Sequence, residues 1–323
     1  METPVLFLIF NRPVITYKVF KKIKNVKPKK LYIAADGPRE NNINDKVNCK
    51  KAREVINKID WDCEVKTLFR DKNLGFPLAI SLAIDWFFKN EEMGIILEDD
   101  CLPDPSFFYF CQELLQKYKD DARIMMISGF NYLINSLEIR ESYFFSNYYC
   151  IWGWATWRRA WKLYDIEMKN WDYFKENNNL VWIYKDKRLA EYVYSLIQST
   201  YDGFIDTWDV QWFFTCITQN GLSIVPSVNL ISNIGWIGAH FNGFEKDIHN
   251  TPTKSIDIRN MIHPEFVFPD MKYNQILFDN IRKKSNNLII RKLQESNFKI
   301  IKLFFNVLYP KLKKIIKGNK QKK

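Results

Sequence analysis

The sequence predicts an α/β fold in which helices flank a mostly parallel sheet. Three observations indicate it: short apolar runs that suit buried strands, segments with helical spacing between them, and polar residues where each run ends. Such alternation of strand and helix implies right-handed crossovers and a Rossmann-like arrangement. In open sheets of this kind, ligands bind beyond the carboxyl ends of the strands.

The first four strands are indicated by their apolar runs. The first is expected over residues 4–10 and runs into Asn11-Arg12. The others are expected over residues 31–35, 64–69 and 94–97, and the second of the four ends at Asp36 in a turn. No GxGxxG follows the first strand, so the usual dinucleotide fingerprint is missing.

Helices are expected between these strands. Val19, Phe20 and Ile23 fall on one face of a helix over 16–24, which Lys27-Pro28 ends. An amphipathic pattern predicts a helix over 49–59, and a largely apolar one predicts a helix over 77–88. Farther on, the pattern predicts helices over 106–117 and 186–200, another opening near Asp209, and strands over 124–128 and 222–225.

Composition and length exclude several classes of protein. The chain has 323 residues, rich in aromatics with 11 Trp, 16 Tyr and 25 Phe, which excludes a disordered or low-complexity body. Its six cysteines are scattered without disulfide-like spacing, which predicts reduced, buried thiols of an intracellular protein. No secretory signal and no apolar stretch of about 20 residues is visible, so no membrane span is expected.

The positive charge of the chain is concentrated at its C-terminal end. Residues 282–323 contain 14 Lys and Arg against one acid, so the net charge of +11 leaves −2 for the rest. We expect a body over residues 1–275 and a basic, amphipathic, helical tail over 276–323. A solvated terminus is the simpler interpretation, but basic residues alternating with apolar ones also suit a helix on an anionic membrane surface. None of the common nucleic-acid-binding motifs appears in the sequence, so we expect no nucleic-acid partner.

Three adjacent carboxylates follow the fourth strand, at Glu98-Asp99-Asp100. They repel one another, so we expect a positive group among them. A divalent cation such as Mn²⁺ or Mg²⁺, shared with a diphosphate, suits oxygen ligands and leaves positions open for phosphates. The alternative is a solvated loop after a strand.

Two further stretches have both a structural and a functional interpretation. The aromatic segment 143–161 contains Trp152-Gly153-Trp154, which suits a core segment or a pocket wall on which a sugar can stack. Asp209 follows Trp208 in or near the first turn of a helix, where the pattern alone favours a helix cap. The histidines lack ligand spacing, so we expect structural roles for them, with His240 kept open because it lies in a glycine-bearing loop.

Five segments between about residues 4 and 245 together resemble a known family. The chain is similar to GT-A nucleotide-sugar glycosyltransferases, and within them to the inverting N-acetylglucosaminyltransferase I type. The acidic triplet followed by Pro103-Asp104-Pro105-Ser106-Phe107-Phe108 is the nearest match. The other four segments are the strand ends at Asn11-Arg12 and at Asp36, the turn Ile151-Trp152-Gly153-Trp154, and Trp208-Asp209. Two departures are Asn11 in place of an acid and Val210-Gln211 in place of an Asp and a Trp.

The resemblance implies a metal-dependent inverting transfer from a nucleotide-diphosphate sugar, UDP-linked in the nearest type, to a hydroxyl of a glycan or lipid-linked acceptor. It implies a nucleotide-binding half over about 1–130 and an acceptor half over about 131–275. Asp100 would bind the metal, with His240 as a further candidate, and Asp209 would be the catalytic base, with Asp206 in reserve. The other implied contacts are with the nucleotide, its phosphates or the donor sugar (Arg12, Asp36, Arg70, Glu98, Asp99) and with the acceptor (Trp152, Gly153, Trp154, Trp208).

The expected setting is bacterial surface-polysaccharide synthesis, by a cytoplasmic enzyme held at the inner face of the plasma membrane by its tail. Two alternatives remain. One is a sugar nucleotidyltransferase, which also has a Rossmann-like sheet. Such an enzyme is expected to have a glycine-rich, basic loop directly after the first strand, whereas this chain has Asn11-Arg12-Pro13 there, without a glycine. The second alternative is a non-catalytic protein that binds a nucleotide or a membrane.

Overall fold

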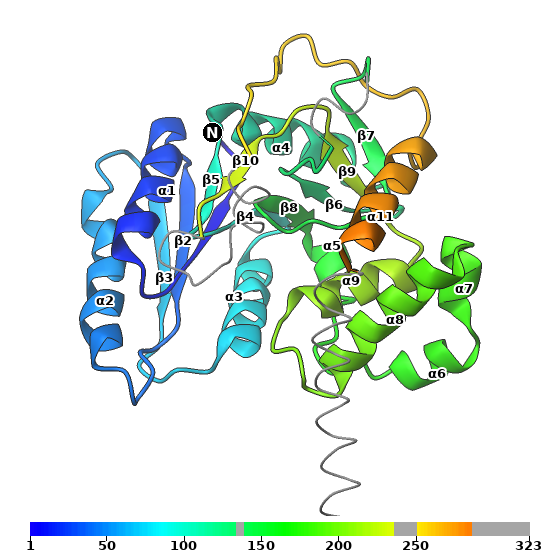
Figure 1. Ribbon diagram of the computed structural model, residues 1–323. Coiled ribbons are helices and arrows are strands. Elements are labelled where there is room, and N and C mark those ends of the chain that lie inside the picture. Colours follow the sequence, from blue (N-terminus) through cyan, green and yellow to red (C-terminus); the bar gives the residue numbers. More distant parts are fainter. Residues whose placement is uncertain (134–138, 236–250, 286–323) are drawn as a thin grey trace, which may run out of the picture.

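A single eight-stranded sheet organises the molecule (Figure 1). The computed structural model describes residues 1–133, 139–235 and 251–285. The strand order is β3-β2-β1-β4-β8-β6-β9-β7. The strands are β1 (Val5–Ile9), β2 (Lys30–Ala35), β3 (Glu64–Phe69), β4 (Met93–Glu98), β6 (Ile124–Ser128), β7 (Tyr143–Ser146), β8 (Trp154–Trp157) and β9 (Leu222–Pro226).

The first four strands are parallel neighbours and confirm the predicted α/β fold with a mostly parallel sheet. Alternate residues of β1 point to opposite faces, so Phe7 and Ile9 join one core cluster while Leu6 and Leu8 join the other. Both faces are therefore covered, as expected for strands that are apolar throughout. One cluster is completed by α1 (Pro13–Val26), α2 (Ile43–Arg53) and α4 (Pro105–Lys117), and the other by α3 (Phe76–Asn90), α8 (Lys187–Tyr201) and α9 (Asp209–Thr218).

The second half of the chain extends the same sheet. β8 lies between β4 and β6 and is antiparallel to both, β6 pairs with β9 in parallel, and β7 forms the edge. A small antiparallel ribbon of β5 (Cys101–Pro103) and β10 (Ile231–Asn233) sits beside the end of β4. Gly153 precedes β8 with a positive φ of 58°, and a side chain there would collide with Ile231 of this ribbon.

Some predicted elements need correction. The helix predicted over 49–59 is α2, which begins at Ile43 because the Asn42 side chain caps it, and it ends at Arg53 before a short 3₁₀ turn over Glu54–Lys58. The aromatic segment 143–161 contains the strands β7 and β8 and the short helix α5 (Arg158–Trp161).

The remaining helices lie beyond β8. α6 (Trp171–Glu176) and α7 (Asn179–Tyr184) precede α8 and lie beside it, and α11 (Met271–Ser285) packs near β7 and α8 (Figure 1). The domain boundary predicted at residue 275 falls inside α11, whose Tyr273 and Leu277 are both buried. All six cysteines are free, and five of them are buried. Among the helices of the described residues, none is long and apolar enough to cross a bilayer.

Candidate functional site

A cavity of about 570 Å³ opens at the carboxyl ends of β1, β2, β3 and β4. Its walls combine three arginines with acidic and amide groups: Arg12, Arg39, Arg70, Asn11, Asn73, Asp36, Glu98, Asp99 and Asp206. Small apolar residues form another part of the lining, among them Ala34, Ala79 and Ala83, and leave room for a flat group. A volume of this size is typical of small-molecule and cofactor sites.

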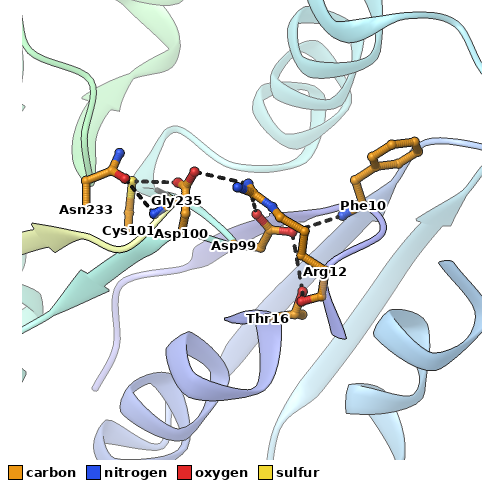
Figure 2. A network of polar contacts seen from close by, with 8 residues as sticks. All are labelled: Phe10, Arg12, Thr16, Asp99, Asp100, Cys101, Asn233 and Gly235. Carbon is orange, nitrogen blue, oxygen red and sulfur yellow. Dashed lines mark hydrogen bonds and ion pairs between the residues drawn. The ribbon is translucent and has the colours of Figure 1, made fainter. Parts of the chain in front are cut away.

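Arg12 lies among the carboxylates that follow β4 (Figure 2). Its Nη2 donates to Oδ1 of Asp99 and, at 3.0 Å, to Oδ2 of Asp100. The pairing of β1 with β4 places Leu8 opposite Glu98, so the residues after both strands meet. The positive group that the acidic triplet requires is therefore present as Arg12, and the triplet does not by itself demand a metal.

Asp99 is held from three directions. Besides Arg12, the backbone N–H of Phe10 and the hydroxyl of Thr16 each donate to its Oδ2 at 3.3 Å. Burial raises the pKa of Asp99 to about 6, although Arg12 opposes that rise. Burial disfavours the charged form of Arg12, yet Asp99 and Asp100 outweigh it and raise the pKa of the guanidinium. Asp99 therefore serves to anchor Arg12 at the cavity wall.

Glu98 has a different environment. Its Oε1 is buried without a hydrogen-bond partner in the described residues. Burial, followed by the charges of Asp100, Asp99 and Asp209, raises the pKa of Glu98 well above its usual value. The Glu98 carboxyl therefore holds its proton more tightly than an exposed glutamate does, and its protonated form can donate a hydrogen bond.

The raised pKa of Glu98 predicts a loss of stability with rising pH in wild type that is absent in Glu98→Gln. A carboxyl whose pKa is raised by folding binds more protons in the folded state, so wild type loses stability as pH rises above about 4.5 toward the folded pKa. Glutamine does not titrate, so the unfolding free energy of the variant, relative to that of wild type, should be higher at pH 8 than at pH 5. Urea denaturation at both pH values measures this, with Glu92→Gln as an exposed control. A difference that does not change with pH would contradict the assignment.

Asp36 and Arg70 both line the cavity, as the sequence interpretation expects for nucleotide contacts. Both oxygens of Asp36 accept from the backbone N–H of Leu74, at 3.0 and 3.1 Å, and Oδ2 also accepts from Asn73. Arg70 donates to the carbonyl of Ala79 at 3.2 Å. Burial lowers the pKa of Arg70, and Asp36 opposes that shift. These bonds fix the loop after β3 against the end of β2.

The contacts that Asp45 makes with Arg39 and Asn11 were not predicted from the sequence. The buried carboxylate of Asp45 accepts from Arg39 at 2.6 Å and from Asn11 at 2.7 Å, so it fixes two cavity-lining side chains. The hydrogen bonds from Arg39 lower the pKa of Asp45. An acid two residues into a helix carries no signal of such a role in a sequence, because its partners come from other segments.

The two candidate bases lie on different sides of the turn before α9. Asp206 is exposed and lines the main cavity. Asp209 is half-buried and lines a smaller aromatic pocket with Tyr148, Tyr192 and Phe213. Because α9 begins at Asp209, Asp206 lies before the helix and the two acids do not share a helical face.

Asp209 is not a helix cap. The cap position is Trp208, no side chain bonds the free N–H groups there, and Asp209 accepts from the hydroxyl of Thr207. The charge of Asp209 contributes to the raised pKa of Glu98, after burial and the charges of Asp100 and Asp99. Asp209 is thus a carboxylate of the smaller aromatic pocket that takes no part in capping.

Two predicted ligand contacts need correction: Trp154 of the aromatic segment, and Trp208, which the resemblance implied as an acceptor contact. Trp154 and Trp208 are 1% and 0% exposed and stack on each other at 5.8 Å, so neither offers a ring face to a ligand. They belong to the core, as the alternative interpretation held. Trp152 is partly buried and packs against Phe130, and Gly153 is buried beneath the β5–β10 ribbon.

Asp100 fits a divalent cation as a single protein ligand. Its Oδ2 bonds Arg12, while its Oδ1 has only the weak thiol donor of Cys101 at 3.6 Å. Gly235 lets the backbone after β10 approach, because a side chain there would lie 2.4 Å from Oδ2. Within the described ranges no three acidic, histidine or cysteine side chains gather as a ligand set, and His240 lies outside those ranges. Mg²⁺ is commonly held by one or two carboxylates together with substrate phosphates, which is compatible with Asp100 alone.

His263 has the structural role expected of it. Its Nδ1 lies 2.9 Å from the hydroxyl of Tyr143, which in turn bonds the hydroxyl of Tyr118. His249, like His240, lies outside the described residues.

Comparison with known proteins finds only remote similarity. No family model matches the chain, and no curated protein matches it. Among solved structures, S. aureus TarS (residues 1–349) is 9% identical, with 44% of this chain and 39% of that chain covered and a TM-score of 0.30. An apo UDP-glucose pyrophosphorylase is 10% identical, with 74% and 95% covered and a TM-score of 0.39. A UDP-glucose pyrophosphorylase complexed with UDP-glucose is 15% identical, with 46% and 64% covered and a TM-score of 0.27. The match spans less than two thirds of the TarS chain.

Proposed function

We propose that this chain is a metal-dependent inverting glycosyltransferase that uses a UDP-linked sugar. The observation that carries the proposal is the cavity at the carboxyl ends of β1 to β4, where three arginines, Glu98 and Asp99 of the acidic triplet, and small apolar residues meet. Asp100 lies outside the lining and contacts it through Arg12. Such a site offers cations to a diphosphate, a slot to a base and carboxyl groups to sugar hydroxyls.

The donor is assigned to the cavity group by group. Arg12 and Arg70 would contact the diphosphate, and Asp36 with its partner Asn73 would contact the base. The Glu98 carboxyl would hydrogen-bond a sugar hydroxyl, while Asp99 keeps Arg12 in place. These roles agree with the resemblance to the N-acetylglucosaminyltransferase I type.

Asp100 would hold the Mn²⁺ or Mg²⁺ ion. When bound, this ion supplies positive charge to the diphosphate as it leaves. Arg12 contributes to the same end from the protein, because it is fixed beside Asp100 before any ligand arrives.

Asp209 would act as the general base. The acceptor hydroxyl oxygen attacks the anomeric carbon as its proton passes to the Asp209 carboxylate, while the bond from that carbon to the diphosphate oxygen breaks. Attack opposite the leaving group inverts the anomeric centre. Asp206 is the reserve base, since it lines the cavity itself.

The acceptor is proposed to be a glycan or lipid-linked sugar of a bacterial surface polysaccharide. The basic segment 276–323 would bring the enzyme to an anionic inner membrane face; all but its first ten residues lies outside the described ranges. Trp152 and Gly153 remain candidates for acceptor contact.

The test is product analysis with a panel of UDP-sugars and Mn²⁺. The proposal expects slow release of UDP without an acceptor and faster release with lipid extracts or oligosaccharides. Formation of UTP from UDP-sugar and pyrophosphate would instead show a nucleotidyltransferase. Neither product with any nucleotide sugar would contradict both and favour a binding protein.

A further inference from the structure

We infer that the outer face of α1 and α2 is a docking surface for an anionic lipid bilayer. We call it the α1/α2 face and define it by exposed side chains at helical spacing on two neighbouring helices: Val14, Tyr17, Lys18 and Lys21 on α1, and Ile43, Lys46, Val47 and Lys50 on α2. Both helices lie together at one end of the sheet (Figure 1).

The charge of these two helices is strongly one-sided. Together α1 and α2 contain eight Lys and Arg against a single acid, Asp45, which is buried and paired with Arg39. Residues 13–58 carry a formal charge of +9, although the chain before residue 282 sums to only −2. Among the described residues, Lys18, Lys21, Lys46 and Lys50 make no ion pair. The positive field of this face is therefore not neutralised within the protein.

Exposed apolar side chains distinguish this face from a merely basic one. Val14 and Ile43 are 70% and 75% exposed and lie in the first turns of their helices, and Val47 is 53% exposed. On each helix an apolar residue lies in the first turn and a lysine lies farthest toward the C-terminal end of the face, although Lys46 precedes Val47 on α2. Branched aliphatic side chains have no use against nucleic-acid phosphates, whereas in an interface they enter the acyl boundary while lysines reach headgroups.

The α1/α2 face lies next to the cavity, so docking through this face would determine where the cavity lies relative to the bilayer. Asn11 and Arg12, which line the cavity, directly precede α1, and Arg39 lies shortly before α2. Val14 and Ile43 therefore lie at the cavity end of the face. A protein docked through them would hold the mouth of the cavity beside the bilayer, and this orientation does not depend on the reaction in the cavity.

The test compares charge-matched variants of the full chain in vesicle flotation. One quartet is Lys18, Lys21, Lys46 and Lys50, each replaced by glutamine; the control quartet is the exposed Lys89, Lys119, Lys162 and Lys187, also replaced by glutamine. On vesicles of phosphatidylcholine with phosphatidylglycerol, the first quartet should lower the partition coefficient by at least about tenfold, because each lysine near such a surface contributes up to about fivefold. The control quartet should have little effect. The C-terminal segment is present in both, so equal losses would overturn the proposal.

A second pair of substitutions separates a lipid partner from an acidic macromolecule. Val14→Ser with Ile43→Ser leaves the charge unchanged and should weaken vesicle binding severalfold. If the serine pair had no effect while the lysine quartet weakened binding to a single-stranded oligonucleotide as much as to vesicles, the bilayer would be the wrong partner. UDP release should be unchanged in both variants, because none of these residues lines the cavity.

Discussion

Replacing Asp209 by asparagine is expected to lower sugar transfer by roughly 10²- to 10⁴-fold, the usual contribution of a general base. The amide keeps the hydrogen bond from Thr207 but cannot take the acceptor proton. UDP binding and thermal stability should change little, since Asp209 is half-buried and forms no ion pair in the described structure. The measurement is the turnover rate at saturating UDP-sugar.

Asp206→Asn is the matched control. It removes an equal charge from the same turn, and its effect on turnover should be less than about tenfold if Asp209 is the base. The reverse order, with Asp206→Asn inactive and Asp209→Asn active, would contradict the assignment and make the cavity-lining acid the base.

Asp100→Asn is expected to abolish metal-dependent turnover while the protein still folds. Metal stabilisation of a leaving diphosphate is worth several kcal/mol, which corresponds to a loss of roughly 10³-fold. Arg12 keeps its bonds to Asp99, so the network after β1 survives. A manganese titration of turnover, with the exposed Asp71→Asn as control, measures the effect.

Retained turnover with an unchanged manganese dependence in Asp100→Asn would contradict the ligand assignment. If a chelator did not lower the turnover of wild type, the reaction would not need the metal. Arg12, already paired with both aspartates, would then be the main cation acting on the diphosphate.

The fold was predictable where the sequence pattern is local. The runs that form β1, β2 and β4 are largely apolar and are followed by polar residues, so these strands and the position of the acidic triplet were predicted directly. β8 was not predicted as a strand. Its four residues, Trp154–Trp157, are buried between β4 and β6, and such a short segment with two tryptophans has the same pattern as any other core segment.

The site was predictable only where it depends on local sequence, as in the acidic triplet, and not where it depends on tertiary contacts. The requirement for a positive group among the three acids was correct, but its identity depends on β1 pairing beside β4, which brings Arg12 to residues 87 positions away. Asp45 and Arg39 were missed because their roles arise from tertiary contacts. Trp154 was considered for a ligand wall, and Trp208 for acceptor contact through the resemblance, because a sequence cannot separate a buried ring from an accessible one.

The central claim is that the cavity beyond β1 to β4 binds a nucleotide diphosphate together with a metal. Thermal unfolding with UDP, with and without Mn²⁺, tests it most directly, in wild type and in Ala79→Leu, which fills the apolar part of the cavity. A ligand at a hundredfold excess over its dissociation constant stabilises the folded state by about 2.7 kcal/mol. We expect such a shift for wild type only when UDP and Mn²⁺ are both present, and none for the variant. Equal midpoints with and without every nucleotide tried, GDP, CMP and dTDP included, would contradict the claim.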